Sequence, residues 1–239
     1  AVTKQGSGTL TIPGTKNFSG TTTVNAGTLK VDGTMASSTF QVNSGGTLTG
    51  GGAVGATTVA NGGTLAGKAG QTLTLASLTL NDGSNVSAAL GAANTTPLFD
   101  VTGNLTLDGK LSVSDAGGFG NGTYRIANYG GTLTNNGLVI GTVPVGYNPG
   151  DWSIQSGSGV VNLLVATGAG EQYWDGANTN PGGVADGRGG NGTWDASSTN
   201  WTNSAGNINA AWAGQKAVFA GTPGTVSVVG SQTFTGLRF

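Results

Sequence analysis

Apolar residues recur at every second position in short stretches along the chain, and glycine-containing breaks follow most of these stretches. Clear examples are Leu-Thr-Leu at residues 73–75 and 105–107 and Val-Ser-Val at 226–228. A period of two is typical of a β-strand that buries one face. No convincing stretch has apolar residues spaced i, i+3, i+4 and i+7. The pattern therefore predicts an all-β chain of short strands and frequent turns, which suits a sandwich, a barrel or a β-solenoid.

An internal repeat favours the solenoid over the other architectures. Val-Asn-Ala-Gly-Thr-Leu at residues 24–29 recurs in variant form at 42–48 and 59–65, and the valines are 18 and 17 residues apart. A strand, an Asn-Gly turn and a second strand, repeated every ~20 residues, describe one coil of a parallel β-helix. One coil has no core of its own, so coils stack ~4.8 Å apart and align like residues in inner columns. A Greek-key sandwich with coincidental turns is the alternative.

The repeat predicts which side chains form the inner columns. The first column contains Val24, Val42 and Val59, and the second contains Leu29, Leu48 and Leu65. We expect about eight stacked coils, at ~4.8 Å each, between residue 1 and about residue 168. The turn glycines should have positive φ, which glycine adopts without steric cost.

The first repeat also carries a family signature. Residues 8–31 contain Phe18, Gly20, Val24 and the triplet Gly-Thr-Leu at 27–29 at the spacing of a known pattern. That pattern is a strand, an aromatic residue before Ser/Thr-Gly, Thr-x-Val, Gly-Thr-Leu and a second strand. The segment resembles the autotransporter-associated β-strand repeat, which is also called the passenger-associated transport repeat.

The C-terminal third has a second resemblance, to a block found between β-helix stretches of large autotransporter passengers. The similar stretches are Tyr-Trp-Asp-Gly at 173–176, Gly-Thr-Trp-Asp at 192–195, Asn-Trp at 200–201, Ala-Val-Phe at 217–219 and Leu-Arg-Phe at 237–239. Together the resemblances imply a right-handed parallel β-helix on the extracellular face of a Gram-negative outer membrane. They also imply a membrane anchor only through a C-terminal β-barrel, which is absent here, so we interpret the chain as a fragment of a longer passenger.

The domain division follows from a shift in composition near residue 168. Four of the five tryptophans lie between residues 174 and 212. We expect β-helix repeats over residues 1–168, a Trp-, Asp- and Gly-rich loop and β insertion over 169–216, and a return to β-solenoid strands over 217–239.

Composition then limits the chemistry. The chain has 239 residues with no Cys and no His, only 8% of them are charged, and the net charge is −1. Without Cys or His, thiol catalysis, Ser-His-Asp catalysis and zinc sites are excluded. A net charge near zero offers no electrostatic basis for binding nucleic acid. We expect no cofactor and no metal.

Two chemical alternatives are polysaccharide cleavage and calcium binding. Paired carboxylates could cleave a polysaccharide, but Glu171 is the only glutamate, and Asp32, Asp82 and Asp108 lie in Asp-Gly turns. The stretch at residues 189–195 is close to a calcium-binding Gly-Gly-x-Gly-x-Asp motif. Its Asp is one place late and the motif occurs once, whereas stacked calcium sites need several copies. We therefore expect no enzyme.

The resemblance implies a non-catalytic adhesin scaffold that binds host-cell-surface or extracellular-matrix molecules. One alternative is a stalk for bacterial self-association and biofilm, in which flat Thr and Asn ladders pair with the same protein on neighbouring cells. The other alternative is a β-helix enzyme that acts on a polysaccharide.

The expected contact region is the loop at residues 178–192, which is rich in Asn, Gly and Asp. Within and beside this loop, the residues expected to contribute to contact are Trp174, Asn178, Asp186, Arg188 and Trp194. Clustered tryptophans favour a small local core that braces the loop, and the alternative is stacking on sugar rings. The exposure of the rings distinguishes these two possibilities.

Overall fold

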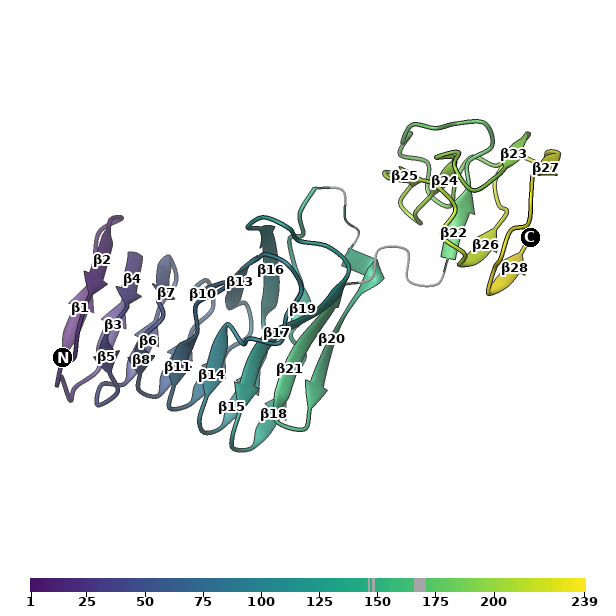
Figure 1. The fold of residues 1–239 in the computed structure, drawn as a ribbon. Coiled ribbons are helices and arrows are strands. Elements are labelled where there is room, and N and C mark those ends of the chain that lie inside the picture. The colour runs from purple at the N-terminus through teal and green to yellow at the C-terminus, as the bar shows by residue number, and fades with distance from the viewer. Residues whose placement is uncertain (146, 148, 166–170) are drawn as a thin grey trace. The chain divides into compact units, whose positions relative to one another are not determined.

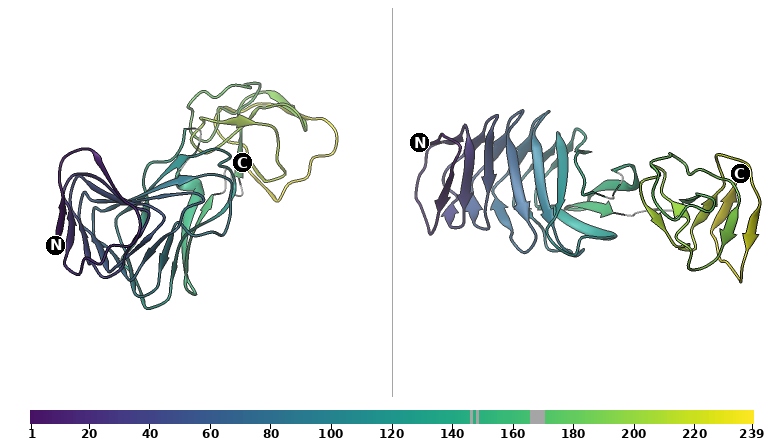
Figure 2. Two further views of the ribbon diagram at one scale, coloured as in Figure 1. Left: turned by 60° about the vertical axis from the view of Figure 1, so that its left-hand side comes forward. Right: turned by 90° about the horizontal axis from the view of Figure 1, so that it is seen from above.

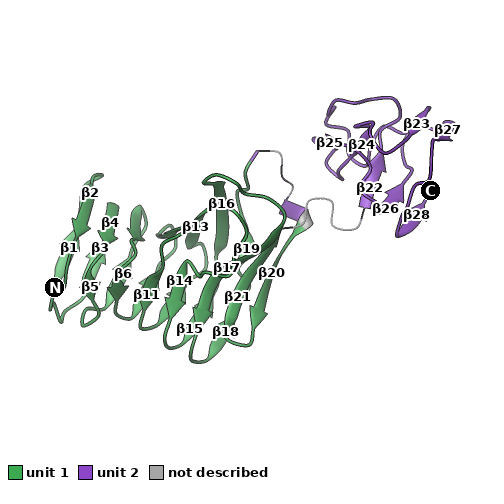
Figure 3. Ribbon diagram, viewed as in Figure 1, with its two compact units in different colours: residues 1–144, 152–165 green, residues 145–151, 166–239 purple. Residues whose placement is uncertain are grey.

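The computed structural model describes residues 1–239 except 146, 148 and 166–170. Its regular elements are strands, apart from a 3-10 turn, η1 (Pro149–Asp151). The chain divides into two compact units (Figure 3): unit 1 contains residues 1–144 and 152–165, and unit 2 contains residues 145–151 and 166–239. Within the described ranges, no helix is long and apolar enough to cross a membrane. The all-β class predicted from the period-two pattern is confirmed.

Unit 1 is built from three sheets (Figure 1). Sheet A contains β1 (Val2–Lys4), β3 (Thr22–Val24), β6 (Phe40–Val42), β9 (Thr57–Val59), β12 (Leu78–Leu80), β15 (Leu105–Leu107) and β18 (Leu133–Asn135). Sheet B contains β2 (Thr9–Ile12), β4 (Gly27–Val31), β7 (Gly46–Thr49), β10 (Thr64–Lys68), β13 (Asn85–Leu90), β16 (Lys110–Asp115) and β19 (Val139–Ile140). Sheet C contains β5 (Thr34–Met35), β8 (Ala53–Val54), β11 (Leu73–Leu75), β14 (Phe99–Val101), β17 (Gly122–Tyr129), β21 (Val160–Val165) and β20 (Trp152–Gly157).

The chain winds as a parallel β-helix. Successive coils place their strands side by side in the same sheet. For example, β6 lies parallel to β3 in sheet A, and β7 lies parallel to β4 in sheet B. Figure 2 shows this ladder from above, with the strands of unit 1 side by side along the stack. Parallel pairing between coils follows from the repeat, because each coil returns the chain to the same side of the core.

The core of unit 1 consists of columns of identical or similar apolar side chains. In sheet A, Val24, Val42 and Val59 are in register, and in sheet B, Leu29, Leu48 and Leu65 are in register. All six side chains are 0% exposed. They are the residues that the repeat predicts for the inner columns. A slip of one residue would turn each column outward, so burial fixes the register.

Glycines between these strands allow the tight turns. Gly27, Gly45 and Gly62 have φ of 64°, 81° and 73°, which confirms the positive φ expected at these turns. Gly46 is required for a different reason, since an added Cβ would lie 2.3 Å from the carbonyl oxygen of Val24 in the previous coil. The spacing between coils therefore leaves no room for a side chain at residue 46.

The expectation of about eight coils is wrong. Each sheet of unit 1 has seven strands, and the last two strands of sheet C, β21 and β20, are antiparallel. They form a hairpin whose two-residue loop, Ser158 and Gly159, has φ of 51° and 82°. Positive φ at both positions is typical of the type I′ turn that reverses a strand. Residues 152–165 therefore cover the end of sheet C without adding another coil, and a period-two pattern does not distinguish the two arrangements.

Unit 2 contains shorter strands and longer loops. Its five-stranded sheet D has the order β25 (Asn209–Ala210), β24 (Trp201–Thr202), β22 (Glu171–Trp174), β26 (Lys216–Val218) and β28 (Gly236–Arg238), and β23 (Gly192–Trp194) pairs with β27 (Val226–Val228). Strands β22, β26 and β28 are parallel, as are β23 and β27. Segments 169–216 and 217–239 thus share one sheet. The expected boundary at residue 168 lies outside the described residues.

Candidate functional site

The tryptophans of unit 2 form a local core. Trp174, Trp194 and Trp201 are 1%, 5% and 0% exposed, and Trp212 and Phe219 pack against them half-buried. Trp201 lies edge-on to Trp174 and Trp194, with ring centroids 5.1 Å and 5.0 Å away. Aromatic rings prefer this geometry to a face-to-face sandwich. The three buried rings leave almost no face on which a sugar could stack, so the local core is the arrangement in the structure.

The loop at residues 178–192 is pinned to this core at its base. The Trp174 indole Nε1 donates to the Gly190 carbonyl at 2.9 Å, and the Gly189 N–H donates to the Trp174 carbonyl at 3.0 Å. Asp175 is buried, and its Oδ1 accepts from the Arg188 N–H at 2.8 Å. The Asn178 side chain donates to the Asp175 carbonyl at 2.7 Å. These bonds hold both ends of the loop on β22.

The tip of the loop is the part that solvent reaches. Residues 179–186 are all exposed. Asp186 has a φ of 61°, and its N–H donates to the Ser204 carbonyl at 2.9 Å, which anchors the tip to the neighbouring turn. Arg188 is half-buried, and its guanidinium lies against Gly182. In the described part of the chain, the ion pairs involve neither Asp186 nor Arg188.

The five residues predicted for the contact region therefore have three different roles. Trp174 and Trp194 lie buried in the local core and brace the loop, as the clustered tryptophans favour, so their rings are not exposed for contact. Asn178 holds the base of the loop. Asp186 is exposed at the tip and Arg188 lies half-buried beside it. What remains for contact is a short exposed segment with one carboxylate.

A charged cluster on sheet D was not predicted from the sequence. Glu171 Oε1 accepts from Lys216 Nζ at 2.8 Å. Glu171 Oε2 accepts from the Tyr173 hydroxyl at 2.9 Å and lies 3.4 Å from a guanidinium nitrogen of Arg238. The Lys216 hydrogen bond, followed by that of Tyr173, holds the pKa of Glu171 below its usual value, while burial raises the pKa of Tyr173. The only glutamate therefore links three parallel strands. Glu171 and Lys216 are 45 residues apart, so no local motif announces the pair.

Several aspartates accept hydrogen bonds from backbone N–H groups close to them in the sequence. Asp195 accepts bonds from the N–H groups of Ser197 and Ser198 at 2.8 Å and 2.6 Å, and these serines lower its pKa to about 2, with Ser198 contributing most. Asp108 and Asp115 likewise accept from N–H groups one and two residues ahead. Among the described residues, no group of three or more Asp, Glu, His or Cys side chains could hold a metal ion. These carboxylates serve as turn-forming residues.

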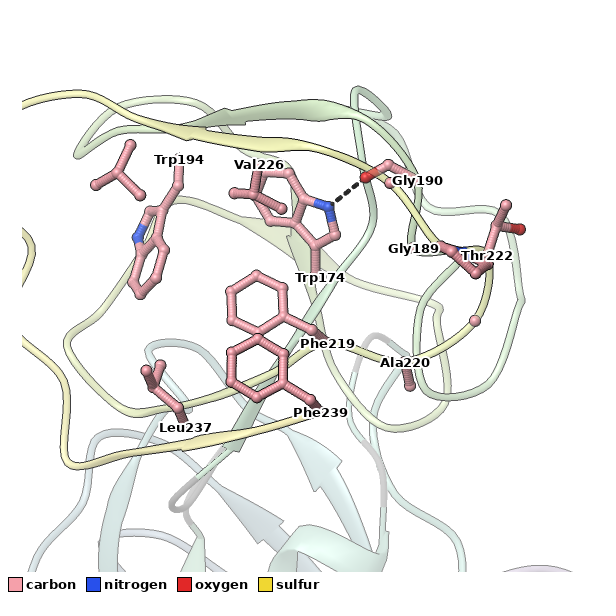
Figure 4. Close-up of a pocket in the computed structure, with 14 residues that line it drawn as sticks. Trp174, Gly189, Gly190, Trp194, Phe219, Ala220, Thr222, Val226, Leu237 and Phe239 are labelled. Atoms are coloured by element: carbon pink, nitrogen blue, oxygen red, sulfur yellow. Dashed lines mark hydrogen bonds between the residues drawn. The ribbon is translucent and has the colours of Figure 1, made fainter.

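An apolar pocket of about 510 Å³ opens on unit 2 (Figure 4). Its walls include Trp174, Trp194, Phe219, Val226, Leu237 and Phe239, together with backbone of the 189–190 and 220–224 loops. None of its lining residues is ionisable, so the pocket offers no general acid or base. In the sequence its walls correspond to apolar strand residues such as Phe219, Leu237 and Phe239, and no motif marks a pocket there.

The outward columns of sheets A and B consist mainly of threonine. The outward column of sheet A contains Thr3, Thr23, Gln41, Thr58, Thr79, Thr106 and Thr134 in register. Sheet B begins with a column of Thr9, Thr28, Thr47 and Thr64. Neighbouring strands lie ~4.8 Å apart, so hydroxyl groups are repeated regularly along both faces.

The chain is similar to one protein family and to one autotransporter adhesin. Residues 2–31, which comprise β1 to β4, match the passenger-associated-transport-repeat family. The chain is also 43% identical over 268 residues to the adhesin BmaC autotransporter of Brucella suis biovar 1 (strain 1330). The alignment covers 100% of this chain and 8% of that protein, so the chain spans a small part of the relative's length.

Proposed function

Because this chain is an autotransporter passenger segment with a passenger-associated-transport repeat, we propose that it is a non-catalytic part of an adhesin that binds host-cell-surface or extracellular-matrix molecules. The chain is displayed at the cell surface, on the outer membrane of a Gram-negative bacterium. In this proposal the β-helix is a stiff scaffold, and contact occurs on its outer surface and loops, where binding residues are commonly found.

The observation that carries the proposal is the similarity of the whole chain to an autotransporter named as an adhesin. The chemistry of the described residues is consistent with it. Glu171 is hydrogen-bonded to Lys216 and Tyr173. Asp108, Asp115 and Asp195 accept hydrogen bonds from the backbone of their own turns. The pocket has an apolar lining. This combination leaves the exposed polar surface as the means of interaction.

We assign the specific contact to the loop tip, residues 179–186. The tip is exposed, whereas its base is held by Trp174 and Asp175, so binding does not have to order the loop first. A preorganised loop loses less conformational entropy on binding than a free one. Each contact should be weak, and many displayed copies would supply avidity.

The test compares two variants of the purified chain on beads. In the loop variant, Asn180→Ala, Val184→Ala and Asp186→Gly change exposed side chains, and glycine retains the positive φ at residue 186. In the control, Thr58→Ala, Thr79→Ala and Thr106→Ala change the outward column of sheet A. Attachment to epithelial cells and to matrix proteins should fall several-fold for the loop variant only. Turnover of a polysaccharide by the intact chain would refute the non-catalytic proposal.

A second candidate is adhesion between bacteria, which the in-register hydroxyl columns of sheets A and B favour. The same beads distinguish it, because aggregation of beads that carry the same chain requires no host molecule. If the triple Thr variant abolished bead aggregation and the loop variant left both attachment and aggregation unchanged, self-association would replace host adhesion as the proposed function.

A further inference from the structure

A β-bulge in sheet C places two polar side chains, Arg125 and Asn128, on the same outer face. Strands β17 and β21 are antiparallel, and their register shifts between Arg125 and Ala127. Ile126 and Ala127 are therefore both buried, at 3% exposure each, and Asn128 returns to the face of Arg125. With regular alternation, residues three apart would point to opposite faces. Bulges that redirect a side chain in this way are common beside functional sites.

Two amide oxygens fix the position of the Arg125 guanidinium. Its Nε donates to Asn162 Oδ1 at 2.7 Å, and its Nη1 donates to Asn128 Oδ1 at 2.7 Å. Asn162 lies directly opposite Arg125 on β21, and Gln155 on β20 lies directly opposite Asn162. These outward side chains cross three adjacent strands (Figure 1). We call Arg125, Asn128, Gln155 and Asn162 the sheet C cluster.

The positive charge of this cluster has no acidic partner. In the ranges that the structure describes, the ion pairs do not involve Arg125, and its side chain makes the two amide bonds and no other hydrogen bond. The guanidinium has further N–H donors, those of Nη2 included. Asn128 and Asn162 each give their oxygen to Arg125, so their NH₂ groups are additional donors. A half-buried guanidinium among spare donors is suited to binding an oxyanion.

A neighbouring carboxylate limits the charge of that anion. Asp100 on β14 is in register with Asn128, so a negative side chain lies one strand away from the cluster. Like charges repel, and a phosphate monoester carries about −1.5 to −2 at neutral pH, so a singly charged carboxylate fits better. The amides of Gln155 and Asn162 can donate to and accept from hydroxyl groups. A carboxylate with hydroxyl groups beside it is the chemistry of an acidic sugar.

We propose that the sheet C cluster binds a carboxylate-bearing sugar residue of a glycan, with Arg125 on the carboxylate and the amides on the hydroxyl groups. Because two amide oxygens already hold the guanidinium, binding would cost it little conformational freedom. The cluster belongs to unit 1, whereas the loop tip belongs to unit 2. The inference therefore goes beyond the proposed attachment through the loop tip and does not depend on it.

The test titrates the purified chain with a hyaluronan tetrasaccharide, in which glucuronate residues supply carboxylates. The reference ligand is the same tetrasaccharide with its carboxyl groups reduced to alcohols. Nuclear magnetic resonance follows the arginine Nε–H signals and the asparagine NH₂ signals. Arg125→Gln removes the charge, and Lys110→Gln is the matched control because it removes one exposed positive charge on sheet B. Asn128→Asp keeps the arginine and gives it an acidic partner, which should block the ligand even if Arg125→Gln folds poorly.

The signals of Arg125, Asn128 and Asn162 should shift saturably with the acidic tetrasaccharide. Its affinity should fall by roughly tenfold or more in Arg125→Gln and in Asn128→Asp, and should be unchanged in Lys110→Gln and in the loop variant of unit 2. Absence of saturable shifts, equal binding of the reduced tetrasaccharide, or full affinity in both cluster variants would overturn the proposal. Displacement of the tetrasaccharide by an equal concentration of inorganic phosphate would overturn the choice of a carboxylate and assign the cluster to phosphate.

Discussion

Leu48 and Thr47 are adjacent in β7, yet they have opposite surroundings. Leu48 is fully buried between Leu29 and Leu65 of the neighbouring coils, whereas Thr47 lies in the outward column between Thr28 and Thr64. Removing a buried side chain loses its transfer free energy and leaves a cavity, while an outward hydroxyl stays hydrated. At the scale of the residue, the direction of the side chain therefore determines its contribution to stability.

Leu48→Ala should lower the free energy of unfolding of unit 1 by roughly 2–5 kcal/mol. Thr47→Ala, one residue away in the same strand, should change it by less than about 0.5 kcal/mol. Urea denaturation followed by far-ultraviolet circular dichroism measures both values. Equal and small losses in the two variants would contradict a packed inner column.

Glu171 predicts a dependence on pH in unit 2. The Lys216 and Tyr173 hydrogen bonds lower the pKa of Glu171 in the folded chain. A lowered pKa gives stabilisation that is present above the unfolded value and is lost as the pH falls through the folded value. Between about pH 5 and pH 3, the thermal midpoint of unit 2 should therefore fall more in the original chain than in Glu171→Gln. The difference should be small, since the group is partly exposed, and identical acid dependence would contradict the role of this carboxylate.

At the scale of the element, the β20–β21 hairpin determines how the β-helix ends. Its strands alternate in burial, with Val161, Leu163 and Val165 inward, and pair along residues 152–165. The sharp turn at Ser158 and Gly159 reverses the chain and prevents another parallel coil. The outer strand of the hairpin, β20, has six residues and forms the edge of sheet C.

Gly159→Ala should destabilise this hairpin by roughly 1–2 kcal/mol, because alanine has a steric penalty at a positive φ of this kind. The space itself is adequate, since an added Cβ would lie 3.4 Å from the Tyr129 carbonyl oxygen. Ser158→Asn is the matched control, because asparagine tolerates this conformation, and it should be neutral. Hydrogen exchange of the Val161 and Leu163 amides measures the effect, and unchanged protection in Gly159→Ala would refute the assigned turn.

At the scale of the whole molecule, the scarcity of charge sets the character of any contact. Only 8% of the residues are charged and the net charge is −1. Three of the charged side chains are paired on sheet D, where Glu171 contacts both Lys216 and Arg238. Long-range attraction is therefore weak, and contacts depend on hydroxyl groups, amides and a few apolar atoms.

Attachment of the intact chain to its target should consequently change little between about 0.05 M and 0.5 M salt, a range over which exposed charges become strongly screened. Bead attachment at both salt concentrations measures this. The control is Asp186→Lys, which replaces a negative side chain of the loop tip with a positive one. A loss of more than tenfold at high salt in the original chain would indicate that charge drives binding.

The sequence alone determined the all-β class, the parallel β-helix and the members of its inner columns. This was possible because successive coils repeat the same local pattern: Val24, Val42 and Val59 occupy equivalent places in three repeats, so equivalence in sequence becomes adjacency in space. The family resemblance of residues 8–31 was readable for the same reason, since its residues lie within one repeat.

The tertiary structure alone decided the reversal at residues 152–165, the hydrogen bonds of Trp174 to Gly189 and Gly190, the Glu171 cluster and the apolar pocket. Strand alternation has the same period in parallel and antiparallel pairs, so it specifies which face is buried without specifying the direction of the partner. The other three features join residues that no repeat relates, such as Glu171 with Lys216 and Trp174 with Gly190. Contacts between non-equivalent segments depend on how the loops of unit 2 close around one core, and that packing exists only in the folded chain.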